Sequence, residues 1–284
     1  MSTQNKPKTK GIIIISVIVL FAAIGTAIAL LLMNGWQNGG AKPDPAATDT
    51  AAERNIDYYS DKRIGVMTGS IYEGIVRKSM PEASLSFFDK AADMADAVVK
   101  GQIDAFICSD TQAGSLVAQT GNIKILGWLD ERSEIAFAFP KTEHGAALRD
   151  EFNEYLAKIR SDGTYDLLVE KWKDGGDKTV EITVTDNARG VLKMATTGTT
   201  EPYTYMSEGR LTGFDIDLAA SFSREYGYDL DIRVMEFGLI IPGLSSEEFD
   251  IAGANITVTD ERAESVYFSD SYTSNGTAMV VANN

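Results

Sequence analysis

The sequence predicts an α/β fold made of two successive units, in a chain that begins with a membrane-spanning segment. Residues 11–33 contain no charged side chain and are mostly Ile, Val, Leu and Ala. Over residues 63–126, short apolar runs alternate with amphipathic stretches, which is the βαβ pattern of a parallel sheet covered by helices. A second alternation of this kind follows over residues 192–282.

The apolar N-terminal segment is expected to be an uncleaved membrane anchor. At 1.5 Å per residue, residues 11–33 reach about 35 Å, which exceeds a hydrocarbon core of about 30 Å. Three lysines precede it, so the positive-inside rule leaves residues 1–10 in the cytoplasm and exports the rest. A cleaved signal peptide is the alternative, because residues 27–29 resemble a cleavage site. Residues 34–56, rich in Gly, Ala, Pro, Asp and Thr, are expected to be a flexible linker.

The first α/β unit is expected over residues 57–174. A strand over 134–139 should stop at Pro140, and apolar residues at helical spacing over 148–159 predict a helix after it. The Asp-Gly pair at 162–163 would end that helix. The other elements expected are strands at 63–67, 84–88, 103–108 and 123–126, and helices at 70–79, 91–100, 111–119 and 164–172.

The second unit is expected over residues 191–284, after a connecting linker at 175–190. Gly227 would close its longest helix, and Thr259 would cap a short one. The elements expected are strands at 192–196, 230–234, 251–256 and 277–282, and a helix at 215–225.

Composition excludes several classes of function. The 284 residues carry 26 basic and 41 acidic side chains, a formal net charge of −15. This balance argues against nucleic-acid binding, which needs a basic face. A single Cys and a single His exclude an intrachain disulfide framework and Cys-cluster or multi-His metal sites. We therefore expect neither a metal nor a cofactor.

Short motifs mark both units. In the second unit they are LTGFDIDL at 211–218, IIPGL at 240–244, ITVTDER at 256–262 and FSD at 268–270. In the first unit they are IGVMTGS at 64–70, GQIDA at 101–105, DGTY at 162–165 and KW at 171–172. Together they resemble the extracytoplasmic solute-binding proteins, family 3, that serve polar amino acid ABC transporters. The resemblance implies a two-lobed, type II periplasmic-binding-protein-like fold with two hinge crossings between the lobes.

The order of the two units is reversed relative to that family. Residues 191–284 resemble the family's first lobe, and residues 57–174 resemble its second lobe with the C-terminal helices. We interpret the chain as a circular permutant in which residues 175–190 join the old ends. A fragment of a longer tandem binding protein is the alternative. In the permutant we expect one covalent hinge crossing, near residues 130–139.

Arg262 is the residue expected to hold a ligand. The resemblance implies that its guanidinium clamps an α-carboxylate in a planar two-point contact. The alternative is a surface arginine paired with Glu261 or Glu264. By the same resemblance, the Thr257 hydroxyl contacts ligand, and Asn255 stands where backbone groups bind the ligand amine.

The wall of the binding site is expected from two further segments. Phe237 matches an aromatic wall of the family's cleft, although core packing would explain it equally well. Gly69, Ser70 and Ile71 follow a predicted strand and open a predicted helix, where free N–H groups attract a carboxylate. A plain helix cap by Ser70 is the alternative.

Three positions depart from the family's pattern. The family's acidic residue on the first strand falls at Thr197, and its stacking aromatic falls near Thr200. The Asp of the other lobe falls at Ser109, with Asp110 one position on. The ammonium site is therefore weakened, and a buried ammonium without a carboxylate partner costs several kcal/mol. Either Asp110 takes over, or the ligand is not a standard α-amino acid, or none is bound.

These features predict a membrane-anchored extracytoplasmic receptor for an ABC importer. It would bind a small carboxylate-bearing ligand, an amino acid or a relative, by closing its lobes, and would dock on an ABC permease. A sensor or co-receptor without a transport role is the alternative. We expect no catalytic residue and no enzyme activity, although relatives with this fold include small-acid dehydratases.

Overall fold

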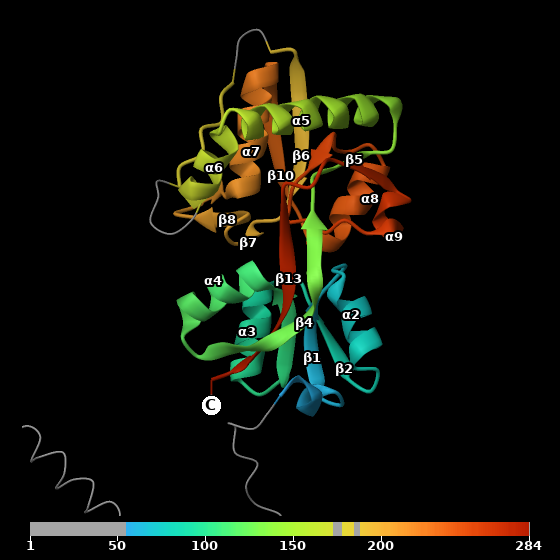
Figure 1. The fold of residues 1–284 in the computed structure, drawn as a ribbon, viewed down its shortest axis with the longest axis vertical. Coiled ribbons are helices and arrows are strands. Elements are labelled where there is room, and N and C mark those ends of the chain that lie inside the picture. The colour runs from blue at the N-terminus through green and yellow to red at the C-terminus, as the bar shows by residue number, and fades with distance from the viewer. Residues whose placement is uncertain (1–54, 173–177, 185–187, 284) are drawn as a thin grey trace, which may run out of the picture. The chain divides into compact units, whose positions relative to one another are not determined.

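The computed structural model of the protein describes residues 55–172, 178–184 and 188–283. The expected cytoplasmic segment and anchor, and nearly all of the expected N-terminal linker, lie outside these ranges. Within them, no helix is long and apolar enough to cross a membrane. The described residues form two lobes, each built on a five-stranded mixed sheet (Figure 1), so the predicted two-lobed α/β fold is confirmed.

The first lobe, lobe A, has the strand order β2-β1-β3-β13-β4. Helices cover both faces of this sheet. Along β3, Phe106 and Cys108 pack with α3 and α4, whereas Ala105 and Ile107 pack with α2. Its elements are η2 (Ile56–Tyr59), β1 (Arg63–Met67), α2 (Tyr72–Ser79), β2 (Ser84–Phe88), α3 (Ala91–Val99), β3 (Ala105–Ser109), α4 (Asp110–Thr120), β4 (Ile123–Ile135) and β13 (Thr273–Ala282).

The second lobe, lobe B, has the strand order β10-β6-β11-β5-β12 and carries a small three-stranded sheet, β7-β8-β9. Its strands are β5 (Ala138–Pro140), β6 (Gly190–Thr196), β7 (Thr199–Thr200), β8 (Thr204–Ser207), β9 (Arg210–Thr212), β10 (Tyr228–Val234), β11 (Ile251–Ala252) and β12 (Val266–Phe268). Its helices are α5 (Glu143–Ser161), α6 (Thr164–Trp172), α7 (Phe214–Tyr226), η3 (Phe237–Leu239), α8 (Ile240–Ser245) and α9 (Asp260–Ala263).

Each sheet receives one strand from the other half of the chain. β5 comes from the N-terminal half and joins lobe B, where it pairs antiparallel with β11 and β12. β13 comes from the C-terminal half and joins lobe A, where it pairs antiparallel with β3 and β4. Both lobes therefore have the same order, in which the exchanged strand is the fourth of five.

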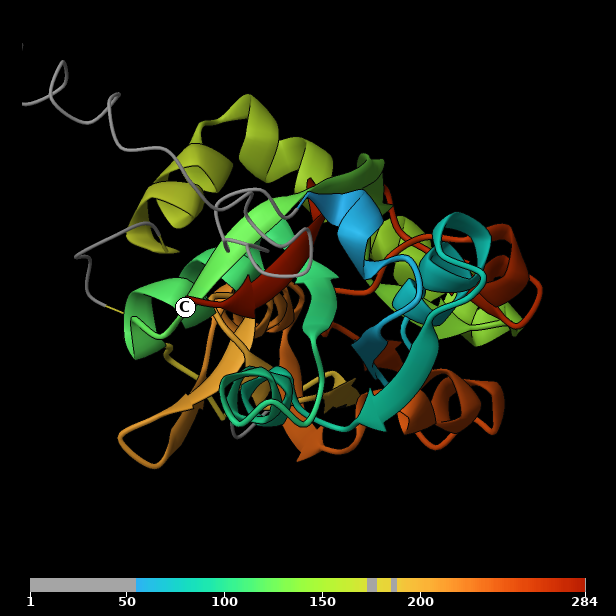
Figure 2. The same cartoon turned by 90° about the horizontal axis from the view of Figure 1, so that it is seen from below.

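The chain passes between the lobes twice, so the expectation of one covalent crossing is wrong. The first passage runs from β4 to β5, and the second runs from β12 to β13. β13 begins at Thr273, earlier than predicted, and Thr273 pairs with Ile135 of β4. Figures 1 and 2 show the two strands side by side where they leave the lobes. Their pairing satisfies the backbone groups of both passages.

One predicted strand is much shorter in the structure. The apolar run at 251–256 forms a strand only over Ile251–Ala252. Asn255 has a left-handed backbone, with φ of 54°, which a β-strand cannot include. The shortening turns the residues after β11 into a loop that faces lobe A.

The helix predicted from apolar spacing over 148–159 is present as α5, and it packs in lobe B. Its buried side chains join the largest core cluster together with residues of β6 and α7. Phe152 packs edge-on against Phe222 of α7, with ring centroids 5.1 Å apart. A helix from the N-terminal half thus completes the core of a lobe whose sheet comes mainly from the C-terminal half.

Candidate functional site

A small cavity lies where the two lobes meet, and we call it the interlobe cavity. Lobe A contributes the end of β1 and the starts of α2 and α4, and lobe B contributes β7, η3, the loop after β11 and α9. The residues that line it are Met67, Ser70, Ile71, Tyr72, Gln112, Thr200, Phe237, Ala254, Asn255, Thr257 and Arg262. Seven residues proposed from the sequence are therefore brought together: Ser70, Ile71, Thr200, Phe237, Asn255, Thr257 and Arg262.

Arg262 is half-buried and bridges the lobes. Its Nη1 donates to the Thr257 carbonyl at 2.7 Å, and its Nη2 donates to the Gly69 carbonyl of lobe A at 3.1 Å. The Phe237 ring lies 5.4 Å from the guanidinium carbon. Burial lowers the pKa of Arg262. In the part of the chain that the structure describes, no carboxylate forms an ion pair with this guanidinium, so the alternative, a pairing with Glu261 or Glu264, is absent there.

Two glycines bring the lobes into backbone contact beside Arg262. Gly69 has a left-handed backbone, with φ of 73°, and a Cβ at this position would lie 2.7 Å from the Gly238 Cα. Only glycine fits such an approach. A second bridge joins the lobes through the Gln119 amide, which donates to the Glu201 carboxylate at 2.5 Å. The structure is therefore a closed arrangement of the lobes.

Closure leaves little free volume. The centre of a water-sized sphere can occupy about 20 Å³ of the interlobe cavity, which is room for about one water molecule. A ligand of several heavy atoms therefore requires the lobes to move apart before it enters.

Asn255 takes part in a hydrogen-bond network behind the cavity. Its backbone N–H donates to the Asp215 carboxylate at 2.8 Å, and its side-chain oxygen accepts from Asn275 at 2.7 Å. The Tyr272 hydroxyl donates to the other Asp215 oxygen at 2.7 Å. Burial raises the pKa of Asp215 to about 7. The Asn255 backbone N–H is thus already donated to a protein carboxylate.

Ser70 and Ile71 sit at the start of α2 without forming the predicted side-chain cap. Ile71 is the N-cap residue, and it makes no capping hydrogen bond. The Ser70 hydroxyl donates to the Met67 carbonyl at 2.6 Å. It accepts only a long contact, 3.4 Å, from the Tyr72 N–H.

Four proposed residues lie outside the lining of the cavity, which are Gly69, described above, and three others. Thr197 is 3% exposed, and its hydroxyl has no hydrogen-bond partner among the described residues. Ser109 caps α4 by accepting from the Gln112 N–H at 3.2 Å. Asp110 is held by Arg132, whose Nη1 lies 2.9 Å from its carboxylate.

Gln112 and Tyr72 line the cavity but were not proposed from the sequence. Gln112 is 5% exposed, and its side-chain amide has no hydrogen bond within the described ranges. Tyr72 is buried beside Ser109, and burial raises the pKa of its hydroxyl. Neither residue stands in a recognisable motif. The position of Gln112 one turn after its cap, Ser109, is the signal that could have pointed to it.

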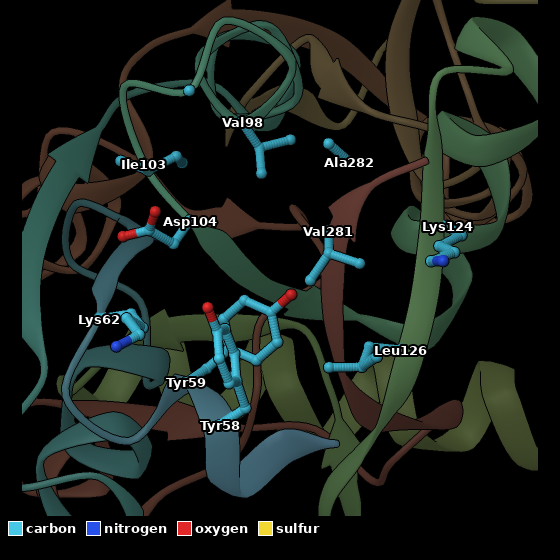
Figure 3. Close-up of a pocket in the computed structure, with 11 residues that line it drawn as sticks. Tyr58, Tyr59, Lys62, Val98, Ile103, Asp104, Lys124, Leu126, Val281 and Ala282 are labelled. Atoms are coloured by element: carbon cyan, nitrogen blue, oxygen red, sulfur yellow. The ribbon is translucent and has the colours of Figure 1, made fainter. Parts of the chain in front are cut away.

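A second pocket lies in lobe A, at the end of the sheet where β1 begins and β13 ends (Figure 3). The Tyr58 and Tyr59 rings and the Lys62 and Lys124 side chains surround it. Its carboxylate, Asp104, accepts hydrogen bonds from the Arg63 guanidinium at 2.9 Å. It contains none of the proposed site residues. Among the residues described, no group of His, Cys, Asp and Glu side chains could hold a metal ion.

Fold and site thus define a two-lobed protein with an arginine, Arg262, in the cavity between its lobes. Residues 192–284 match the family model of the bacterial extracellular solute-binding proteins, family 3. The match covers β6 through β13 and includes Arg262, Thr257, Asn255 and Phe237.

Individual relatives agree with the family match. The arginine-binding extracellular protein ArtP of Bacillus subtilis is 31% identical over 31% of this chain and 34% of its own length. The L-cystine-binding protein TcyA of the same organism is 32% identical over 32% of this chain and 35% of its own length. Cyclohexadienyl dehydratase of Pseudomonas aeruginosa is 34% identical over 31% of this chain and 33% of its own length. The chain spans about a third of the length of these curated relatives.

Proposed function

We propose that this protein is an extracytoplasmic solute-binding receptor of an ABC import system, with a small carboxylate-bearing ligand bound between its lobes. The observation that carries the proposal is the state of Arg262. It faces a cavity between two lobes, it is half-buried, and it donates only to neutral carbonyls. A guanidinium in this position is suited to a ligand carboxylate, which would give it two charge-assisted hydrogen bonds.

Lobe movement would couple binding to recognition by a permease. Arg262, Thr257 and Phe237 belong to lobe B, whereas Ser70, Ile71 and Gln112 belong to lobe A. A ligand that contacts both sets favours the closed arrangement over the open one. The paired strands β4 and β13 form the connection about which the lobes would move.

We also propose that the two halves are circularly permuted relative to the family. The family match falls on residues 192–284, the C-terminal part of this chain, and each sheet takes its fourth strand from the other half. A chain rearranged so that residues 191–284 precede residues 57–174 should fold and bind the same ligand with similar affinity. If the rearranged chain failed to fold while the original folds, the permutant would give way to the tandem-fragment interpretation.

The anchor belongs to the proposal as well. An uncleaved segment at 11–33 would hold the receptor at the outer face of the membrane, with residues 34–56 as its tether. N-terminal sequencing of the protein from a membrane fraction distinguishes an intact anchor from a cleaved signal peptide.

The interlobe cavity favours binding over catalysis. Within the described residues, its lining contains no carboxylate that could move a proton. The similarity to a dehydratase concerns about a third of each chain and does not by itself bring the reaction to this protein. Incubation with a bound acid and analysis of the products would reveal turnover, which we do not expect.

Thermal unfolding of the full chain in detergent, against a panel of amino acids and other small carboxylates, tests the proposed function. A ligand that binds the native state raises the midpoint temperature as its concentration rises. We expect one cooperative transition that a subset of the acids moves upward. A transition that no acid moves would contradict the receptor and favour a sensor or scaffold.

A further inference from the structure

We propose that the interlobe cavity selects small carboxylates that carry a hydroxyl, or another neutral polar group, in the place of an amino acid's ammonium. The inference rests on the proposed function and specifies the ligand of the same site. Among the described residues that line the cavity, Arg262 is the one charged side chain. A ligand with one negative charge balances it, whereas a zwitterion adds a buried ammonium that no carboxylate faces.

Asp110, the carboxylate that the sequence suggests for an ammonium, already has a cationic partner. It precedes Gln112 by two residues and is close enough to Tyr72 to influence its pKa. Its Oδ2 accepts from Arg132 Nη1 at 2.9 Å, and its Oδ1 accepts from the Thr111 N–H at 2.8 Å. Arg132 is itself fixed by its Nε, which donates to the Ser274 hydroxyl at 3.0 Å. The negative charge of Asp110 is therefore already balanced by this guanidinium.

Two further carboxylates near the cavity are also engaged. Asp215 is fully buried behind Asn255, with one oxygen on the Asn255 N–H and the other on the Tyr272 hydroxyl. Glu201 accepts from the Gln119 amide and lies 4.0 Å from Lys178. Neither acid lines the cavity. Among the described residues that line the interlobe cavity, an ammonium would therefore meet no carboxylate.

The polar groups that do line the cavity suit a neutral ligand group. Gln112 is 5% exposed, and its side-chain amide makes no hydrogen bond among the described residues, so the amide can both donate to and accept from a ligand. The hydroxyls of Thr200 and Thr257 have the same dual capacity. A ligand hydroxyl can both donate to and accept from these groups. An ammonium can only donate, and it is repelled by the nearby guanidinium.

Isothermal titration of the full chain with matched acids tests the inference. The pairs are L-lactate with L-alanine, L-2-hydroxyisocaproate with L-leucine, and L-3-phenyllactate with L-phenylalanine. Within a pair, hydroxyl and ammonium are similar in size, so the comparison isolates charge. For the pair whose side chain fits, we expect the hydroxy acid to bind at least about 10-fold more tightly, which is about 1.4 kcal/mol.

A charge introduced into the lining provides an independent test. Gln112→Glu keeps the size of the side chain and adds the missing carboxylate, so the preference should shift at least about 10-fold toward the amino acid of the pair. Gln102→Glu adds the same charge at an exposed site away from the cavity and should leave the preference unchanged. Thermal unfolding of each variant shows whether it folds. If Gln112→Glu does not fold, the inference is judged from the binding of the matched hydroxy and amino acids to the wild-type protein alone.

The outcomes separate this inference from the proposed function. Tighter binding of the amino acids by the wild-type protein would overturn the inference and keep the receptor. Binding of no acid in any pair or in the wider panel would overturn the proposed function itself. An unchanged preference in a folded Gln112→Glu protein would show that the lining does not set the charge of the ligand, which also overturns the inference.

Discussion

The arginine at the hinge and the arginine at the interlobe cavity have different partners. At the hinge, Arg132 forms an ion pair with Asp110 at 2.9 Å and also donates to the hydroxyl and carbonyl of Ser274. At the cavity, the Arg262 guanidinium donates to two carbonyls and lies over an aromatic ring. Behind the cavity, the Asp215 carboxyl group accepts from a hydroxyl and an N–H group. Opposite charges compensate each other in the first region only. The charge of the hinge arginine is therefore balanced by a carboxylate, whereas the guanidinium at the cavity has only neutral partners among the described residues, as the proposed ligand carboxylate requires.

The buried carboxylate behind the cavity should give the largest effect on stability. Burial raises the pKa of Asp215 from 3.8 to about 7. Between about pH 4 and pH 7, Asp215 is therefore protonated in the folded protein and ionised in the unfolded chain. Its contribution to the free energy of unfolding is complete below pH 4 and is lost as the pH rises through 7. A pKa difference of about 3 corresponds to about 4 kcal/mol.

Asp215→Asn tests this contribution, because asparagine stays neutral at every pH. Urea unfolding of both proteins from pH 4 to pH 8 should show the variant gaining stability relative to the wild type as the pH rises. A difference in the free energy of unfolding that does not vary with pH would mean that Asp215 is ionised in the folded state. Asp215 would then resemble the ionised Asp110 at the hinge more closely than we expect.

Removal of the cavity arginine should give the largest effect on binding. Arg262→Gln should weaken binding of the acids found in the ligand panel at least about 100-fold, because two charge-assisted hydrogen bonds are lost. The free energy of unfolding should change by less than about 1 kcal/mol, since the burial cost of the guanidinium disappears with its bonds.

Arg233→Gln is the matched control for this change. Arg233 lies on β10 with its guanidinium 3.0 Å from Asp231, and it does not line the interlobe cavity. Titration calorimetry should find wild-type affinity in this variant. Retained affinity in Arg262→Gln would remove Arg262 from the binding site.

The contact between the two glycines should affect closure by a moderate amount. In Gly69→Ala, the added Cβ meets the Gly238 backbone at 2.7 Å, and the left-handed φ of 73° disfavours alanine. We expect the closed arrangement to lose about 2 kcal/mol and small-angle scattering to show a larger radius of gyration. Gly238→Ala is the control, because its nearest new contacts are 3.7–3.9 Å. Equal radii for the two variants would contradict this role of Gly69.

The smallest effect is expected from the hinge pair. Arg132→Gln removes the partner of Asp110, but the arginine side chain is 59% exposed, so solvent screens much of the interaction. We expect a loss of about 1 kcal/mol in the free energy of unfolding, measured with urea. A loss as large as that expected for the buried Asp215 would erase the distinction between the two regions.

The sequence predicted well the parts that depend on local pattern. The apolar spacing of Leu148, Phe152 and Ile159 marked α5, and all three side chains are buried. The prediction of a strand over 251–256 was too long, because an apolar run does not reveal the left-handed backbone of Asn255. Gln112 was missed because its place in the lining depends on closure of the two lobes.

Two α/β units and an arginine just after a short helix's start could be derived from the sequence alone, because periodicity and capping are properties of neighbouring residues. Only the tertiary structure decided that β5 and β13 change lobes and that the chain crosses the hinge twice. It also decided that Asp110 forms an ion pair with Arg132, whereas the Arg262 guanidinium donates hydrogen bonds to carbonyls. The exchange of β5 and β13 depends on pairing between segments more than a hundred residues apart, as does the contact of Arg262 with Gly69, and neighbouring residues in the sequence do not encode such contacts.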